Sequence, residues 1–319
     1  MKLTTGIAFL ASFAPALAQT SDEDLAKQLQ NPVASLISVP FQFNYDDRIG
    51  PLDEGWRFQL NFQPVIPVKL NDDWNLIIRT IIPYISQEDV YKGTTPGFPG
   101  PPEDVLRKIL PGFRDRANEL ARQAFERRAS KIPLDRHQDG LGDITQSFFF
   151  SPSHPTSRGW IFGFGPVFGY PTATDDLLGS EKWSAGPTLL ALRQTGGWTY
   201  GVLTNHLWSF AGDDDRRSVN ATFVQPFISY TTKKKTTFGL NSEATYDWNE
   251  SQWTVPVNAT VSQLLRVGKL PVSLGLGGRY YAEGPSGAPE WGLRLIVTLL
   301  FPEGHPASPP PSDGKSYRK

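Results

Sequence analysis

Residues 55–70, GWRFQLNFQPVIPVKL, constrain the fold most because their character alternates from one residue to the next. Every second residue from Trp56 to Leu70 is apolar, whereas most positions between them, from Arg57 to Lys69, are polar. Successive side chains of a strand point to opposite faces, so this stretch predicts one apolar and one polar face. A typical strand has about five or six residues, and a tilted strand of about 9 to 11 crosses a bilayer. Alone, the stretch fits either a secreted β-sandwich or a membrane-spanning strand.

The same alternation recurs along the chain and decides between these two folds. Strands are expected at 39–46, 55–70, 74–86, 142–150, 160–170, 183–193, 198–209, 220–231, 237–248, 253–264, 271–281 and 291–301. Single-chain bacterial membrane barrels have an even number of antiparallel strands. We therefore predict an all-β fold, a transmembrane antiparallel β-barrel of about 12 strands over residues 39–301, with both ends on the periplasmic side.

Four segments are expected to lie outside the barrel wall. Residues 1–18 carry one basic residue, an apolar run and the small-residue ending Ala16-Leu17-Ala18, which predicts a cleaved signal peptide. Residues 19–38 predict a periplasmic N-terminal segment with a short helix. Residues 92–137 predict a helical extracellular loop insertion, which is either a solvated hairpin or a lid over a pore. Residues 302–319 predict a disordered Pro-rich tail.

The charged residues of the predicted strands fall on the polar face. This placement is expected of a membrane barrel, because an Arg facing lipid near the bilayer midplane costs about 2–4 kcal/mol. The polar face would then line a pore of mixed charge. The predicted pore-lining residues are Arg57, Gln59, Asn61, Arg79, Glu243, Asp247, Arg279 and Arg294.

Tryptophans and prolines add two further expectations. All nine tryptophans fall at ends of predicted strands, as in the aromatic girdles of membrane barrels. Trp74, Trp160 and Trp198 would mark the periplasmic interface and the other six the outer interface. Prolines inside predicted strands cannot donate to a strand ladder, so bulges or kinks are expected there. These prolines are Pro64, Pro67, Pro83, Pro166, Pro187, Pro226 and Pro256.

Composition and motifs limit the function classes. The 319 residues carry a formal charge of −1, which disfavours nucleic-acid binding, and the absence of Cys excludes a thiol nucleophile and a disulfide framework. His206, near Asn205 and Ser209, has the residue types of a hydrolase, but a polar residue at a strand end near an interface is the favoured explanation. The acidic run 213–215 fits a solvated loop better than a Ca²⁺ site. No cofactor, metal site or enzyme activity is predicted.

Several phrases resemble a known family. They are DLAKQLQNPVASLISVPFQ (24–42), LNDDWNLIIRTIIP (70–83), GLGDITQSFFFSP (140–152), PTATDDLLGSEKWSAGPT (171–188), AGDDDR (211–216), NATFVQPFISYTT (220–232) and TYDWNESQWTVPVN (245–258). They are similar to Gram-negative outer-membrane barrels catalogued as transporters or as phenol meta-degradation pathway proteins, some of which are labelled neuromedin U. The resemblance implies an outer-membrane barrel and a role in solute uptake. It supplies no site residues, and the insertion and the tail depart from the pattern.

Together these observations predict a passive channel for small solutes in the bacterial outer membrane. The family label adds aromatic or hydrophobic compounds as candidate solutes. The expected partners are outer-membrane lipid and lipopolysaccharide, the small solute and the outer-membrane assembly machinery, with no nucleic acid. One alternative is a closed structural or surface-interaction barrel, because side chains can fill a small barrel completely. A membrane-bound hydrolase is the other alternative.

Overall fold

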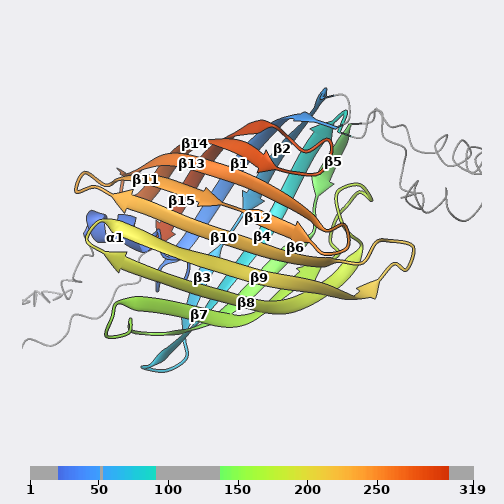
Figure 1. Cartoon of the computed structure of the whole chain (residues 1–319). Helices are drawn as coiled ribbons and strands as arrows, with labels where there is room; N and C mark the ends of the chain where they lie inside the picture. The colour runs from blue at the N-terminus through green and yellow to red at the C-terminus, as the bar shows by residue number, and fades with distance from the viewer. Residues whose placement is uncertain (1–20, 51–52, 91–136, 302–319) are drawn as a thin grey trace, which may run out of the picture.

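A computed structural model gives the structure of residues 21–50, 53–90 and 137–301. These residues form a closed antiparallel β-barrel with one short helix, α1 (Asp22–Gln28), at one end (Figure 1). The predicted signal peptide, the tail and nearly all of the insertion 92–137 lie outside the described residues. We call the barrel end that carries the helix the α1 end and the opposite one the far end.

Fifteen strand segments build the wall. They are β1 (Ile37–Ile49), β2 (Gly55–Phe62), β3 (Val65–Lys69), β4 (Trp74–Glu88), β5 (Gln138–Leu141), β6 (Ile144–Pro152), β7 (Trp160–Tyr170), β8 (Lys182–Thr195), β9 (Trp198–Gly212), β10 (Asn220–Thr231), β11 (Thr236–Ser242), β12 (Ala244–Asp247), β13 (Gln252–Val267), β14 (Leu270–Glu283) and β15 (Trp291–Phe301). Three crossings are each split into two segments, β2 with β3, β5 with β6, and β11 with β12. The barrel therefore has twelve strands, as predicted.

The barrel closes where β15 pairs with β1. Their antiparallel register runs from Ile37 opposite Phe301 to Asp47 opposite Trp291. The last strand thus ends beside the start of the first, which places both at the α1 end. Closure leaves no strand edge with unpaired backbone groups, which is the condition for a sheet to exist in lipid.

The alternation in the sequence becomes an apolar outer face and a polar inner face. In β15 the outward side chains of Leu293 and Leu295 are 56% and 40% exposed, whereas the inward side chain of Arg294 is 3% exposed. The tryptophans form two groups, as expected. Trp74, Trp160 and Trp198 each begin a strand at the α1 end, and Trp56, Trp183, Trp208, Trp248, Trp253 and Trp291 lie near the far end.

Prolines account for the split crossing at Glu243. The register places Pro226 of β10 opposite Ser242 and Pro256 of β13 opposite Glu243. Because neither proline has a backbone N–H, the ladder is interrupted on both sides of β11 and β12. The bulge expected at Pro256 is present, since the β13–β14 register shifts between Val255 and Pro256.

A bulge accompanies some of the other prolines and is absent at the rest. Beside Pro83 the register of β4 changes between β5 and β6, as expected of a bulge. Pro64 separates β2 from β3 without a change of register. Pro166 and Pro187 lie directly opposite each other in β7 and β8, and no bulge falls at that pair.

Candidate functional site: the barrel lumen

The lumen contains a cluster of charged side chains on its inner wall. We define the lumen cluster as Arg57, Arg79, Arg279, Arg294, Asp46 and Glu243. Each of these residues comes from the polar phase of an alternating strand, or, for Glu243, from the break between β11 and β12. Four guanidinium groups face two carboxylates, so the cluster carries an excess of two positive charges.

Arg294 and Glu243 form the central ion pair of the cluster. The Arg294 Nη1 and Nη2 atoms donate to the two carboxylate oxygens of Glu243 at 2.9 and 2.7 Å, and Nε donates to Asn44 Oδ1 at 2.7 Å. Parallel bonds of this kind fix both side chains. The pair therefore ties the split crossing to β15 and β1 across the lumen.

A second group lies nearer the far end. Arg279 Nη1 lies 3.4 Å from Asp46 Oδ2, and Nη2 donates to the hydroxyl of Tyr281 at 2.9 Å. Arg57 Nε donates to Gln87 Oε1 at 2.7 Å, and Gln87 in turn donates to Gln138. Asp46 Oδ1 and Arg279 Nε are buried without a hydrogen-bond partner among the described residues. This layer therefore keeps hydrogen-bonding capacity that a solute or water would satisfy.

Arg79 lies nearer the α1 end and has only a neutral partner. Its Nη2 donates to Gln63 Oε1 at 2.9 Å, and no carboxylate of the described residues lies within 4.0 Å of its guanidinium. Gln59 and Asn61 are bonded to each other at 2.7 Å along the same inner wall.

The predicted pore-lining residues thus share the inner face, with one qualification of position. Asp247 lies at the far end and pairs with Arg217 of the loop before β10 rather than with the lumen cluster. That these residues line an open passage stays a prediction. The sequence analysis left out Asn44, Asp46, Gln63 and Asn258, which are all buried inside the barrel. Each lies in phase with a predicted inward residue, so strict use of the alternation would have found them.

The N-terminal segment closes the lumen at the α1 end. We call residues 21–36 the plug. Its Val33 packs in a cluster with Ile77, Phe149, Leu190, Leu192 and Leu203 from four strands of the wall. All six side chains are at most 5% exposed, so Val33 is buried against the inner wall formed by these strands. This segment belongs to the predicted periplasmic N-terminal segment 19–38, and its apolar side chains are buried inside the barrel mouth.

The helix of the plug is anchored by apolar and polar contacts. Leu25, Ala26, Ala34 and Leu36 form a buried cluster with Leu264 and Leu300 of the wall. Gln194 Nε2 donates to the carbonyl oxygen of Lys27 at 2.8 Å. The predicted helix is confirmed, and Ser21 caps it by accepting a hydrogen bond from the backbone N–H of Asp24.

Asp22 holds the start of the plug through two cations. Its carboxylate accepts from Arg266 Nε at 2.8 Å and from Lys235 Nζ at 2.9 Å. The hydrogen bonds from Arg266 and then Lys235 lower the pKa of Asp22 to about 2. The carboxylate therefore stays charged, and its ion pairs stay formed, throughout the neutral and mildly acidic range.

The His206 ring contacts residues of β10 rather than Asn205 or Ser209, its polar neighbours in the sequence. Its two ring nitrogens lie 2.7 Å from Thr222 Oγ1 and 3.1 Å from Asn220 Oδ1, both on β10. Its ring centroid is 3.9 Å from that of Trp208, and the indole N–H of Trp248 also donates to Thr222 Oγ1. These contacts place His206 in the aromatic girdle of the far end, where they satisfy both of its nitrogens.

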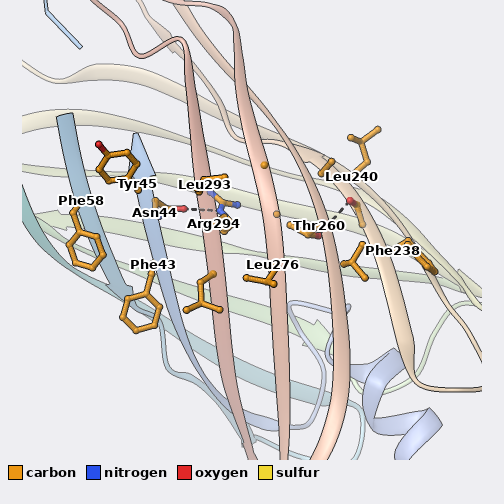
Figure 2. Close-up of a pocket in the computed structure, with 16 residues that line it drawn as sticks. Phe43, Asn44, Tyr45, Phe58, Phe238, Leu240, Thr260, Leu276, Leu293 and Arg294 are labelled. Carbon is orange, nitrogen blue, oxygen red and sulfur yellow. Dashed lines mark hydrogen bonds between the residues drawn. The ribbon is translucent and has the colours of Figure 1, made fainter. Parts of the chain in front are cut away.

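A large apolar groove of about 890 Å³ lies on the outer wall, not in the lumen. Figure 2 shows Phe43, Phe58 and Leu276 along it and the Asn44–Arg294 hydrogen bond behind it. The exposed side chains that line it include Leu293 and Phe238. Such a surface fits lipid acyl chains, so the groove belongs to the outer face of the barrel.

The described residues contain neither a membrane-spanning helix nor a metal-binding cluster of side chains. None of their helices is both long and apolar enough to span a membrane. Nor do they contain a group of three or more His, Asp or Glu side chains that could hold a metal ion.

Comparison with known proteins supports the barrel architecture. In sequence, the chain matches no protein-family model and no curated protein. In structure, it is similar to the COG4313 outer membrane channel from Pseudomonas putida F1, with a TM-score of 0.55 and 13% identity, over 83% of this chain and 94% of that one. This protein is a β-barrel of the outer-membrane type.

The barrel also matches two porins at lower similarity. The NanC porin has a TM-score of 0.44 and 8% identity, over 84% of this chain and 100% of that one. The KdgM porin has a TM-score of 0.39 and 11% identity, over 83% of this chain and 99% of that one. At these identities the likeness concerns the fold alone, and the family suggested by the sequence phrases stays an interpretation.

Proposed function

We propose that this protein is a passive channel for small solutes in the bacterial outer membrane and that the plug closes it at the periplasmic end. The observation that carries the proposal is the contrast between the two parts of the lumen. The wall provides charged and amide side chains from the far end down to Arg79, whereas the seal below them comes from a segment that is not a strand of the wall. A polar lumen closed by a separable segment suits a passage better than a structural core.

The lengths of the connections between strands indicate the orientation of the barrel in the membrane. Short turns, such as Gly196-Gly197 between β8 and β9, lie at the α1 end, and the longer connections lie at the far end. Outer-membrane barrels have short periplasmic turns and longer extracellular loops. The α1 end is then periplasmic. Lipid, lipopolysaccharide and the assembly machinery remain the expected partners, and the insertion 92–137 remains a candidate extracellular lid.

The apolar layer around Val33 bears on the solute class. With the plug displaced, Ile77, Phe149 and Leu190 would still form an apolar patch on the side of the lumen built by β4, β6 and β8. Solutes with an apolar body, including the aromatic or hydrophobic compounds suggested by the family resemblance, would pass such a patch at lower cost than fully polar ones.

The test compares single-channel conductance of the refolded mature protein with that of a variant lacking residues 21–36. We expect small or rare conductance steps for the full chain and large, long-lived steps for the deletion. Heat-modifiable migration in gels would show that both proteins are folded. The second candidate is a closed structural barrel, which the buried cluster around Val33 favours. Silence of both folded proteins would establish that candidate and exclude the channel.

A further inference from the structure

A cavity of about 170 Å³ lies between the plug and the barrel wall. The plug contributes residues from Gln28 to Leu36, and the wall contributes Gln63, Val65, Arg79 and Gln225. Its lining mixes polar side chains, among them Arg79, Gln63 and Gln225, with apolar ones such as Leu29, Pro32 and Val65. It shares no lining residue with the outer groove.

The charge of Arg79 is the unusual element of this cavity. A guanidinium stays protonated in proteins, and a charge inside a protein normally pairs with an opposite charge. Arg294 and Arg279 both have carboxylate partners in the lumen cluster, whereas Arg79 and Arg57 each donate to the neutral oxygen of a glutamine, Gln63 and Gln87. Of these two arginines, Arg79 lines the cavity, where an acceptor of negative charge would give its guanidinium a charged partner.

We propose that this cavity binds a small organic carboxylate, held by Arg79 and capped by the plug, and that the channel solute belongs to this class. The assignment of the solute rests on the proposed channel function, whereas the binding site does not. Arg79 takes the carboxylate through its planar fork of donors, a geometry that matches two oxygens. Gln63 and Gln225 supply amide groups, and Leu29, Pro32 and Val65 contact the apolar body of the ligand.

The features of the lumen fit the same ligand class along its whole length. The excess of two positive charges in the lumen cluster attracts anions, and rings of Arg or Lys favour anions in other pores. The apolar patch that includes Ile77 and Phe149 suits the hydrocarbon part of the molecule. A volume well below that of pockets for drug-sized ligands limits the site to an anion of few atoms.

The test is a calorimetric titration of the full mature protein in detergent and chloride-free buffer with butyrate, and with butyramide as its neutral isostere. We expect butyrate to bind and butyramide to bind about tenfold or more weakly, because a charge-assisted hydrogen bond is replaced by a neutral one. Arg79→Gln should abolish the difference between the two ligands, and Arg79→Lys should retain part of it. Arg193→Gln, the same change on the outer wall at the α1 end, should bind like the native protein.

The outcomes separate this inference from the channel proposal. Equal binding of butyrate and butyramide, undiminished butyrate binding by Arg79→Gln, or no binding by the native protein would each overturn the carboxylate site. Chloride binding as tight as that of butyrate would overturn the organic class of ligand. Butyrate binding by a protein that never conducts would retain the site and reject the channel. Conductance without butyrate binding would retain the channel and reject the carboxylate site.

Discussion

Arg294 and Glu243 face each other across the lumen with two parallel hydrogen bonds of 2.9 and 2.7 Å, and the Arg294 side chain is only 2% exposed. The pair joins the break in the wall caused by Pro226 and Pro256 to the strand that closes the barrel. It therefore stabilises the barrel at the point where the backbone ladder is interrupted.

Removing one partner of this pair should destabilise the barrel strongly. Arg294→Gln leaves the Glu243 carboxylate inside the lumen without its cation, and losing one partner of a buried pair costs about 3–5 kcal/mol. Urea unfolding in lipid vesicles, followed by tryptophan fluorescence, measures the loss. The double variant Arg294→Gln/Glu243→Gln removes both charges and should recover most of the stability. A double variant as unstable as the single one would show that packing, not charge pairing, is at stake.

The plug should be released when its apolar contact is disrupted. Val33→Asp places a carboxylate among Ile77, Phe149 and Leu192, where burial of an unpaired charge is strongly unfavourable. We expect faster cleavage by trypsin after Lys27 and more frequent channel opening. Ser35→Asp, which adds the same carboxylate at an exposed position of the plug, is the control and should leave both properties unchanged. Equal cleavage rates in the two variants would contradict the seating of the plug through Val33.

Acid should loosen the plug only at low pH. The pKa of Asp22 is lowered to about 2 from its ordinary value of 3.8 by Arg266 and Lys235, so its contribution is complete above about pH 4 and is lost as the pH falls through about 2. Opening frequency should be constant from pH 7 to pH 5 and rise below pH 4. Asp22→Asn should open more often at neutral pH and lose the acid response.

The control for this experiment lies on the same helix. Among the described residues, Glu23 pairs only with Lys27 within α1, at 3.0 Å, and has no ion pair with the wall. Glu23→Gln should therefore keep the acid response of the native protein. An acid response that persists in Asp22→Asn would assign it to another group.

Two glycines of the wall should differ in their tolerance of a methyl group. A Cβ at Gly186 would overlap the carbonyl oxygen of His206 on the neighbouring strand, whereas a Cβ at Gly278 meets no atom within 4 Å. Gly186→Ala should lower the stability by about 1–3 kcal/mol through overpacking. Gly278→Ala should be neutral or slightly stabilising, because Ala restricts the unfolded chain more than Gly. The urea midpoints of the two variants measure the difference, and equal midpoints would refute it.

The alternation of residues such as Trp56, Arg57 and Phe58 was enough to predict the barrel. Side chains of a strand alternate with a period of two, and lipid outside a barrel permits one polar face only, the inner one. The inward placement of Arg57, Arg79, Arg279 and Arg294 follows from the same rule. Local geometry and solvent together therefore determined the strand count, the tryptophan girdles and the facing of the charges.

The partners inside the lumen could not be read from the alternation. Glu243 meets Arg294 because two prolines interrupt the ladder at the break between β11 and β12, which lies three strands from β15 in the closed barrel. Among the described residues no carboxylate lies within 4.0 Å of Arg79, because the side chains that face it are set by the stagger of all twelve strands. The position of the plug inside the barrel mouth was not predicted, since a short segment with Leu25, Val33 and Leu36 has no periodicity that reveals its partner.

The sequence by itself determined the class of fold and the two faces of its wall, because both follow from the period of a strand and from the solvents on either side. Only the tertiary structure decided which charges pair, where a cavity remains and what closes the lumen. Those outcomes depend on contacts between residues far apart in the chain, such as Asp22 with Arg266 and Val33 with Leu203. Such contacts arise from the closure and stagger of the barrel, which no local pattern encodes.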